Sequence, residues 1–162
     1  MDLRKYTDDD FNVLNSWITD ADLLFQFAGT AWTFPLTRKQ MQDYQALHPD
    51  RQFYIAHHDH QQPFAFGEII IGDINTPRLG RLLVGEKESR GKGLGLHFVN
   101  MLVKECKRLF SCHTVYLYVF EDNIAGLRCY QKAGFEFDND KKINFTLGEK
   151  SRTALIMKRL LA

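Results

Sequence analysis

The chain has 162 residues, which is enough for one domain with a packed core. Its apolar fraction of 44% and charged fraction of 25% are typical of a globular protein. The formal net charge of +1 and the lack of any apolar stretch of membrane-spanning length argue against nucleic acid and membranes as partners.

The first half of the chain predicts helices followed by a meander of strands. Hydrophobic periodicity, caps and turn signals set the expected boundaries. The expected elements are a strand at Leu3–Lys5, a helix capped by Thr7, a helix at Ala21–Ala28, a helix from the cap Thr37 to Leu47, and strands at Gln52–His57, Phe64–Ile71 and Leu79–Val84.

The second half alternates strands with helices and ends in a hairpin. The expected elements are a helix from a glycine-rich turn to Phe110, a strand at Val115–Phe120, a helix at Asn123–Ala133 ended by Gly134, and strands at Phe135–Phe145 and Thr153–Leu160 around a turn near Gly148. This order predicts an α+β fold with a central, mixed, mostly antiparallel sheet of about 6–7 strands flanked by about 4 helices. We expect residues 1–162 to form a single domain.

Cysteine and histidine usage indicates neither disulfides nor metal. Cys106, Cys112 and Cys129 make an odd count without a C-x-x-C pair, which favours a reduced, cytoplasmic chain. The stretch His57-His58-Asp59-His60 suggests metal ligands, but it lies between two apolar runs and leads into Gln61-Gln62-Pro63. A polar hairpin tip is therefore the favoured interpretation.

The segment Arg90-Gly91-Lys92-Gly93-Leu94-Gly95 follows a predicted strand and precedes a predicted helix. Missing β-carbons let a backbone wrap around a ligand, and free N–H groups at a helix start attract phosphate oxygens. A dinucleotide fingerprint would need glycine at Leu96, and a P-loop would need Ser or Thr after Lys92. Neither of these two motifs fits.

A second segment has the form Asn123…Tyr130-x-Lys132-x-Gly134-Phe135. Seven residues are close to two helical turns, so Asn123 and Tyr130 share a helix face about 10 Å apart along the axis. Taken alone, Tyr130 is better interpreted as a core residue in the same stripe as Ile124 and Leu127.

Together the two segments resemble the GNAT superfamily of N-acetyltransferases, specifically from Leu79 to Phe135. Trp17, Asp20 and Asp22, and the closing Gly148…Arg152-Thr153-Ala154, further resemble the branch that contains ribosomal-protein and polyamine N-acetyltransferases. The resemblance implies a GNAT-like fold and direct transfer of an acetyl group from acetyl-CoA (coenzyme A) to a primary amine.

The resemblance also implies roles for individual residues. The backbone of Leu82, Leu83 and Val84 would pair with the pantetheine arm, and an N–H near Val84 would stabilise the oxyanion. Arg90 through Gly95 would hold the pyrophosphate, and Asn123 would bond the arm. Tyr130 would contact the cofactor near its sulfur and protonate the leaving thiolate, which a phenol of pKa about 10 can do for a thiol of about 8.5.

The general base is where this sequence departs from the family. The strands that often carry a glutamate, Leu79-Gly80-Arg81-Leu82 and Val115–Phe120, hold no acid. Glu68, in an otherwise apolar strand, is the first candidate, although an outward-facing position would explain it equally well. The other acids are Asp73 and Glu121 as runners-up, then Glu86 and Glu88 in the loop entering the phosphate site.

The acceptor is the least defined part. The early aromatic residues Phe25, Phe27, Trp32 and Phe34 could hold a polyamine, an aminoglycoside ring or a peptide N-terminus, or could simply pack. The absent family glutamate keeps a different class open, a catalytically silent acyl-CoA-binding or regulatory module. An interaction scaffold without cofactor is a third reading, and related enzymes are often homodimers.

Overall fold

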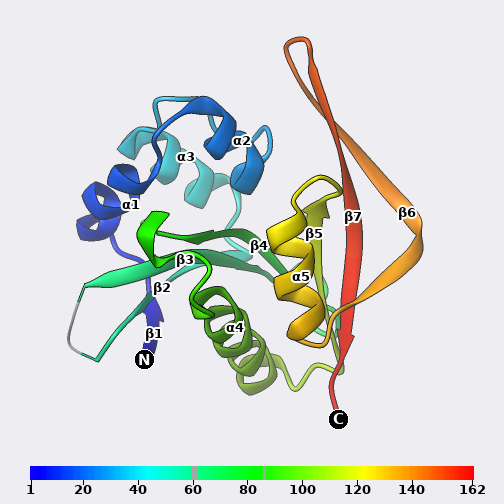
Figure 1. Cartoon of the computed structure of the whole chain (residues 1–162). Coiled ribbons are helices and arrows are strands. Elements are labelled where there is room, and N and C mark those ends of the chain that lie inside the picture. Colours follow the sequence, from blue (N-terminus) through cyan, green and yellow to red (C-terminus); the bar gives the residue numbers. More distant parts are fainter. Residues whose placement is uncertain (60–61, 86) are drawn as a thin grey trace.

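The computed structural model describes residues 1–59, 62–85 and 87–162, with the side chains of residues 139 and 140 also left undescribed, and is built on one sheet (Figure 1). Its strands are β1 (Asp2–Lys5), β2 (Arg51–His57), β3 (Pro63–Ile70), β4 (Arg78–Val84), β5 (Thr114–Phe120), β6 (Glu136–Leu147) and β7 (Lys150–Leu160). Its α-helices are α1 (Phe11–Trp17), α2 (Ala21–Ala28), α3 (Arg38–Leu47), α4 (Leu94–Phe110) and α5 (Ile124–Lys132).

The sheet has seven strands in the order β1-β2-β3-β4-β5-β7-β6. Only the β4–β5 pair is parallel, and every other neighbouring pair is antiparallel. The predicted α+β class with a mixed, mostly antiparallel sheet is therefore confirmed. The described residues form five α-helices where about four were expected.

Local sequence signals set most element boundaries. The Asp20 carboxylate accepts a hydrogen bond from the Leu23 amide at 2.8 Å and caps α2, and the Thr37 hydroxyl accepts one from the Gln40 amide at 3.2 Å and caps α3. Gly134 follows α5 at a φ of 87°, as predicted for the residue that ends a helix. The helix expected after Thr7 begins as a 3₁₀ turn at Asp8–Asp10 before α1.

The two faces of the sheet carry separate cores. Helices α4 and α5 pack on one face, where Phe98, Leu102 and Leu117 are fully buried. Helices α1, α2 and α3 cover the other face around Phe53 and Phe66 (Figure 1). An opening between two strands of this sheet would therefore join the face covered by α4 and α5 to the face covered by α1, α2 and α3.

Strands β4 and β5 separate soon after they begin. They pair only at Arg78–Tyr116 and Leu79–Leu117, although both strands continue for several residues. Between Gly80 and Leu83, β4 also carries one residue more than the facing stretch of β3, and Arg81 there has a φ of 49°. The bulge bends β4 away from β5 and leaves one backbone edge of β4 without a strand partner.

The His-rich segment after β2 and the acid Glu86 lie partly or wholly outside the described residues. His57, His58 and Asp59 end β2 and enter the turn toward β3, as the hairpin prediction requires, whereas His60 and Gln61 lie outside the described residues. Glu86 also lies outside them. Within the described ranges, no three His, Cys, Asp or Glu side chains gather into a potential metal site, and no helix is long and apolar enough to cross a bilayer.

Candidate functional site

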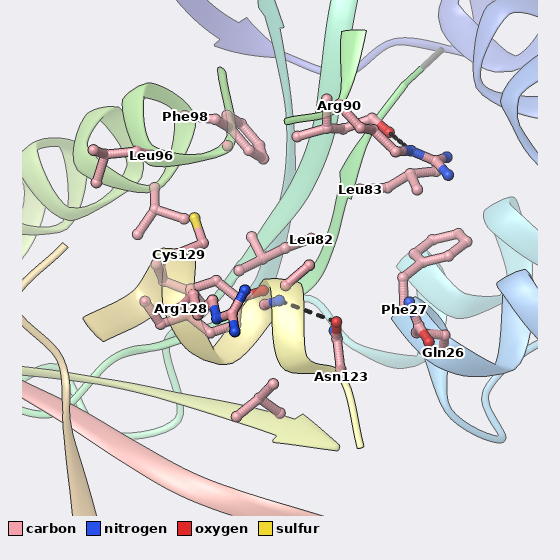
Figure 2. Close-up of a pocket in the computed structure, with 18 of the residues that line it drawn as sticks. Gln26, Phe27, Leu82, Leu83, Arg90, Leu96, Phe98, Asn123, Arg128 and Cys129 are labelled. Carbon is pink, nitrogen blue, oxygen red and sulfur yellow. Dashed lines mark hydrogen bonds between the residues drawn. The ribbon is translucent and has the colours of Figure 1, made fainter. Parts of the chain in front are cut away.

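A cleft of about 490 Å³ opens where β4 and β5 separate. Its walls come from β4, the end of β5, the start of α4, one face of α5 and the C-terminal half of α2, as Figure 2 shows with Leu82, Asn123 and Phe27 facing it from three sides. The volume falls within the roughly 300–1,000 Å³ of ligand-binding clefts. The two motifs singled out in the sequence therefore meet at one cavity.

The start of α4 is an open backbone cradle at one end of the cleft. No side chain caps this helix, so its first amides have no partner within the described residues. Gly91 and Gly93 line the cleft with φ of 78° and 80°, and a β-carbon at either would meet nothing within 4 Å. Positive φ values and a bare helix start create an anion-binding site for a group such as a diphosphate.

Arg90 holds the loop against β4. Its Nε donates to the Val84 carbonyl at 3.1 Å and its Nη2 to the Gly85 carbonyl at 3.0 Å. Arg90, Gly91, Gly93 and Gly95 all line the cleft. Of the same predicted segment, Lys92 and Leu94 are not among the lining residues, and Lys92 is exposed.

The predicted β4 residues Leu82, Leu83 and Val84 also line the cleft. They lie beyond the last β4–β5 pair, so the backbone edge that would face β5 is open there. Unpaired peptide groups on a strand edge bind an extended ligand as an added strand would. This edge fits the amide-containing arm that the sequence resemblance assigned to it.

Asn123 combines a structural contact with a free donor. Its side-chain oxygen accepts a hydrogen bond from the Gly126 amide at 3.0 Å and so caps α5 (Figure 2). A β-carbon on Gly126 would lie 2.6 Å from Asn123 Nδ2, so the residue at 126 must be small. The Asn123 amide group, which lines the cleft, then remains available to donate to a ligand.

Tyr130 also lines the cleft, about two turns along α5 from its capping residue Asn123. Its partly buried ring packs edge-on against Phe135, with centroids 6.4 Å apart. Burial raises the pKa of the Tyr130 phenol well above its ordinary value, and the neighbouring Cys129 adds to the shift. The hydroxyl thus keeps its proton at neutral pH and can act as a donor toward the cleft.

Glu68 lies outside the cleft lining and is completely buried. Its Oε1 accepts a hydrogen bond from Arg81 Nη1 at 2.8 Å, and its Oε2 has no partner among the described residues. Gly80, which lines the cleft, lies against it, since a β-carbon on Gly80 would be 3.3 Å from Glu68 Oε1. The carboxylate is therefore buried beside a lining residue without lining the cleft itself.

The other acidic candidates lie apart from the cleft. The Asp73 carboxylate accepts a hydrogen bond from the Asn75 amide at 2.8 Å in an exposed turn. Glu88 and Glu121 are exposed and are not among the lining residues. None of these three acids therefore lies at the cleft, whereas Glu68 lies against Gly80, which lines it.

One of the aromatic candidates for the acceptor pocket lines the cleft, and others are packed in the protein core. Phe27 lines the cleft. Phe25 is buried against Phe120, with ring centroids 5.5 Å apart, and Trp32 is buried among Tyr44 and other rings of the second core.

Phe34 is 45% exposed and does not line any of the described cavities. Of the four aromatic candidates, Phe27 is therefore the one that faces the main cleft.

Sequence reasoning missed several lining residues. Arg128 and Lys132 lie four residues apart on α5 and add positive charge to the cleft wall, while Gln26 faces it from α2. The basic pair at helical spacing was a usable signal. No sequence signal pointed to Gln26, because its position depends on how α2 packs over the open ends of β4 and β5.

Comparison with known proteins connects this geometry to one family. The Acetyltransferase (GNAT) family model matches residues 21–135. A probable spermine N(1)-acetyltransferase of Bacillus subtilis subsp. natto (strain BEST195) is 38% identical over 65 residues, which are 40% of this chain and 41% of that protein. A spermine/spermidine N(1)-acetyltransferase of Bacillus subtilis (strain 168) is 38% identical over 72 residues, 44% of this chain and 45% of that protein. The matches thus span less than half the length of these curated relatives.

Solved structures show the same fold over nearly the whole chain. Spermidine N-acetyltransferase from Vibrio cholerae, in complex with CoA and spermine, superposes with a TM-score of 0.80 at 13% identity, covering 98% of this chain and 94% of that one. The aminoglycoside acetyltransferase AAC(6')-Ib in complex with coenzyme A gives 0.76 at 20% identity, covering 98% and 93%. Because the family match runs from α2 through the Tyr130 motif, this chain belongs to the acetyltransferase (GNAT) family.

Proposed function

We propose that this chain is an acetyl-CoA-dependent N-acetyltransferase that passes an acetyl group directly to a primary amine in a ternary complex. The observation that carries the proposal is that a bare helix start, an open strand edge and a protonated phenol all face one cleft. Acetyl transfer from a thioester needs these three functions, which are binding a diphosphate, aligning the arm and protonating a thiolate.

The described residues fit coenzyme A. The amides at the start of α4, with Gly91 and Gly93, offer an anion cradle that no side chain fills. Arg90, Arg128 and Lys132 add positive charge around the same cleft. Leu82, Leu83 and Val84 would align the arm through their backbone, and an amide near Val84 would donate to the carbonyl oxygen as negative charge develops on it.

Tyr130 supplies the proton to the leaving thiolate in this proposal. The raised pKa of its phenol keeps the donor protonated over the working pH range. Its hydroxyl makes no hydrogen bond to another described residue, so the proton is not already engaged. A positioned acid of this kind contributes about 10²- to 10⁴-fold to the rate.

Glu68 remains the predicted acceptor of the proton that the attacking ammonium must lose. Its buried position beside Gly80 requires a water between the amine and the carboxylate, because the side chain itself does not line the cleft. Its Oε2 is the atom available for such a relay, since Oε1 is held by Arg81.

The proposal includes the wider expectations from the sequence. Residues 1–162 would act as one N-acetyltransferase domain in the cytoplasm, where Cys106, Cys112 and Cys129 remain free thiols. Its partners would be acetyl-CoA and an amine-bearing small molecule or peptide N-terminus, without nucleic acid, membrane or metal. A homodimer is compatible with this activity, which does not depend on it.

Free-thiol release from acetyl-CoA, measured across an amine library, tests the proposal. We expect turnover by the wild type, a loss of kcat of about 10²-fold or more in Tyr130→Phe, and a loss of similar size in Glu68→Gln. Coenzyme A affinity, measured by calorimetry, should change little in both variants, because neither removes a contact to the diphosphate and Tyr130 would contact the cofactor only near its sulfur.

Two substitutions outside the cleft serve as controls. Tyr116→Phe removes a tyrosine hydroxyl from β5, and Glu105→Gln removes a carboxylate that pairs with Arg108 on α4. Both should turn over like the wild type. Tight coenzyme A binding with no turnover on any amine would instead support the catalytically silent acyl-CoA-binding module.

A further inference from the structure

A second cavity, of about 170 Å³, adjoins the cleft at the separation of β4 and β5. The two cavities share wall residues, among them Phe27, Gly80, Arg81 and Tyr118. The second cavity extends away from the α4 cradle toward Ala28, Gly29 and Phe145. An amine that attacks a thioester held in the cleft would approach through it, and we call it the acceptor pocket.

The sheet register gathers arginines at this pocket. Arg51 faces Ile70 across β2 and β3, and Ile70 in turn faces Arg78 on β4, so the three side chains lie on one face of the sheet. Glu68, two residues before Ile70, lies on that face too. Arg78 and Arg81 line the acceptor pocket, and Arg51 and Arg81 line the adjoining cavity under α3.

The charges in this group do not balance. Arg81 pairs with Glu68 at 2.8 Å, and Arg51 donates to the Tyr44 hydroxyl at 2.6 Å. The lining of the acceptor pocket includes no Asp or Glu among the described residues. Three guanidinium groups therefore share one buried carboxylate.

Of the three, Arg78 is the guanidinium that has neither a counterion nor a hydrogen bond among the described residues. Its guanidinium carbon lies 4.1 Å from the centre of the Tyr118 ring, and it forms no salt bridge or hydrogen bond with another described residue. Burial lowers the pKa of Arg78, Tyr118 and Glu68 act against this shift, and the charges of Arg51 and Arg81 add to it. A partly buried cation beside other cations is costly in the free protein, so an anion bound there would be favoured.

Three described carboxylates near the mouth of the cleft already have partners within the protein. Asp22 pairs with Lys150, Asp122 pairs with Arg152 at 2.6 Å, and Asp20 caps α2. These three described carboxylates are therefore not free to bind a second or third ammonium group of a polycation. Polyamines carry several ammonium groups at neutral pH, because amine pKa values lie near 10.

We propose that the acceptor is a compact amine that also carries a carboxylate, with the carboxylate bound by Arg78 in the acceptor pocket. The inference rests on the proposed acetyltransferase function and narrows its substrate class. A planar guanidinium already oriented by the Tyr118 ring matches a carboxylate with two parallel hydrogen bonds. The Bacillus relatives are named for spermine and spermidine, so this chain would differ from them in its acceptor.

The test compares matched acceptors in the thiol-release assay. Each of several amino acids is assayed beside its carboxamide and its decarboxylated amine, with spermine and spermidine in the same panel. We expect kcat/KM for the carboxylate member to exceed that of its partners by about 10-fold or more, the effect of a hydrogen bond to a charged group. Polyamines should be poorer acceptors than the best amino acid.

Arg78 variants assign the preference to this side chain. Arg78→Gln should reduce the ratio between carboxylate and carboxamide by about 10-fold, and Arg78→Lys should keep part of it because the charge remains. Arg108→Gln, on the exposed face of α4, is the matched control and should keep the wild-type ratio. Thermal melts verify that each variant is folded.

The outcomes separate this inference from the function on which it rests. Turnover of polyamines or carboxamides at least equal to that of the amino acids would overturn the inference alone, as would a preference that survives Arg78→Gln. No thiol release with any amine, in a protein that still binds acetyl-CoA, would overturn the acetyltransferase proposal and this inference together.

Discussion

Asn123 shows how one side chain can serve the fold and a ligand through different atoms. Its oxygen caps α5 by accepting from the Gly126 amide, and the residue lines the cleft, where its side-chain nitrogen would donate to the proposed cofactor. We predict that Asn123→Ala lowers the free energy of unfolding by roughly 1 kcal/mol through the lost cap and weakens coenzyme A binding about 10-fold through the lost donor. Urea unfolding and calorimetry measure the two effects.

The two roles of Asn123 separate in a second variant. Asp is as good a helix cap as Asn, so Asn123→Asp should keep the stability within about 0.5 kcal/mol. It should nevertheless lose coenzyme A affinity, since a carboxylate cannot donate and repels phosphates. Wild-type affinity in Asn123→Asp would remove Asn123 from the proposed cofactor site.

The start of α4 depends on backbone conformation rather than on side-chain contacts. Gly93 has a φ of 80°, and a β-carbon there would meet nothing within 4 Å, so Gly93→Ala introduces strain without a clash. We expect a loss of about 1–2 kcal/mol in stability if the loop keeps its shape, or a shifted loop if it relaxes. Either way coenzyme A affinity, measured by calorimetry, should fall about 10-fold or more.

Gly148 provides the matched control for that substitution. It has a φ of 61° in the β6–β7 turn, with equally open surroundings, and it does not line the cleft. Gly148→Ala should therefore cost similar stability and leave coenzyme A affinity unchanged. Equal affinities in Gly93→Ala and Gly148→Ala would contradict the anion cradle.

Elements with strong local signals were predictable, and pairings between distant elements were less so. The cap at Thr37 and the stop at Gly134 lie where the sequence placed them, since short-range hydrogen bonds decide both. β7 begins at Lys150 rather than the expected Thr153, because its hairpin partner β6 stabilises residues with weak strand preference. The separation of β4 and β5 is a property of the whole sheet and leaves no trace in either strand.

At the scale of the whole molecule, the main cleft was easier to predict from the sequence than the acceptor pocket. The main cleft is built largely from residues 79–135, the stretch that contains both sequence motifs. The acceptor pocket joins α2, β4, β5, β6 and β7, and Arg78 has no motif around it. The positive charge of this pocket could be recognised only from the strand register, which brings Arg78 close to Arg51 and Arg81.

Buried tyrosines make the stability of the whole molecule depend on alkaline pH. Burial raises the pKa of Tyr44 and Tyr54 to about 12, and that of Tyr6 and Tyr130 well beyond the ordinary value. Above pH of about 10 the unfolded chain releases protons that the folded chain retains, so folding stability is complete below about 10 and falls as pH rises toward 12.

A Tyr54→Phe variant isolates one of these contributions. Each such tyrosine lowers the free energy of unfolding by about 1.4 kcal/mol per pH unit between its two pKa values, and Tyr54→Phe should make the decline less steep by that amount. Val103→Ala, which removes buried methyl groups without a titrating change, should lower the whole curve and keep its slope. Urea unfolding between about pH 8 and 11.5 measures both slopes. Because groups common to all variants cancel in the comparison, an unchanged slope in Tyr54→Phe would mean that this hydroxyl titrates alike in the folded and unfolded chains.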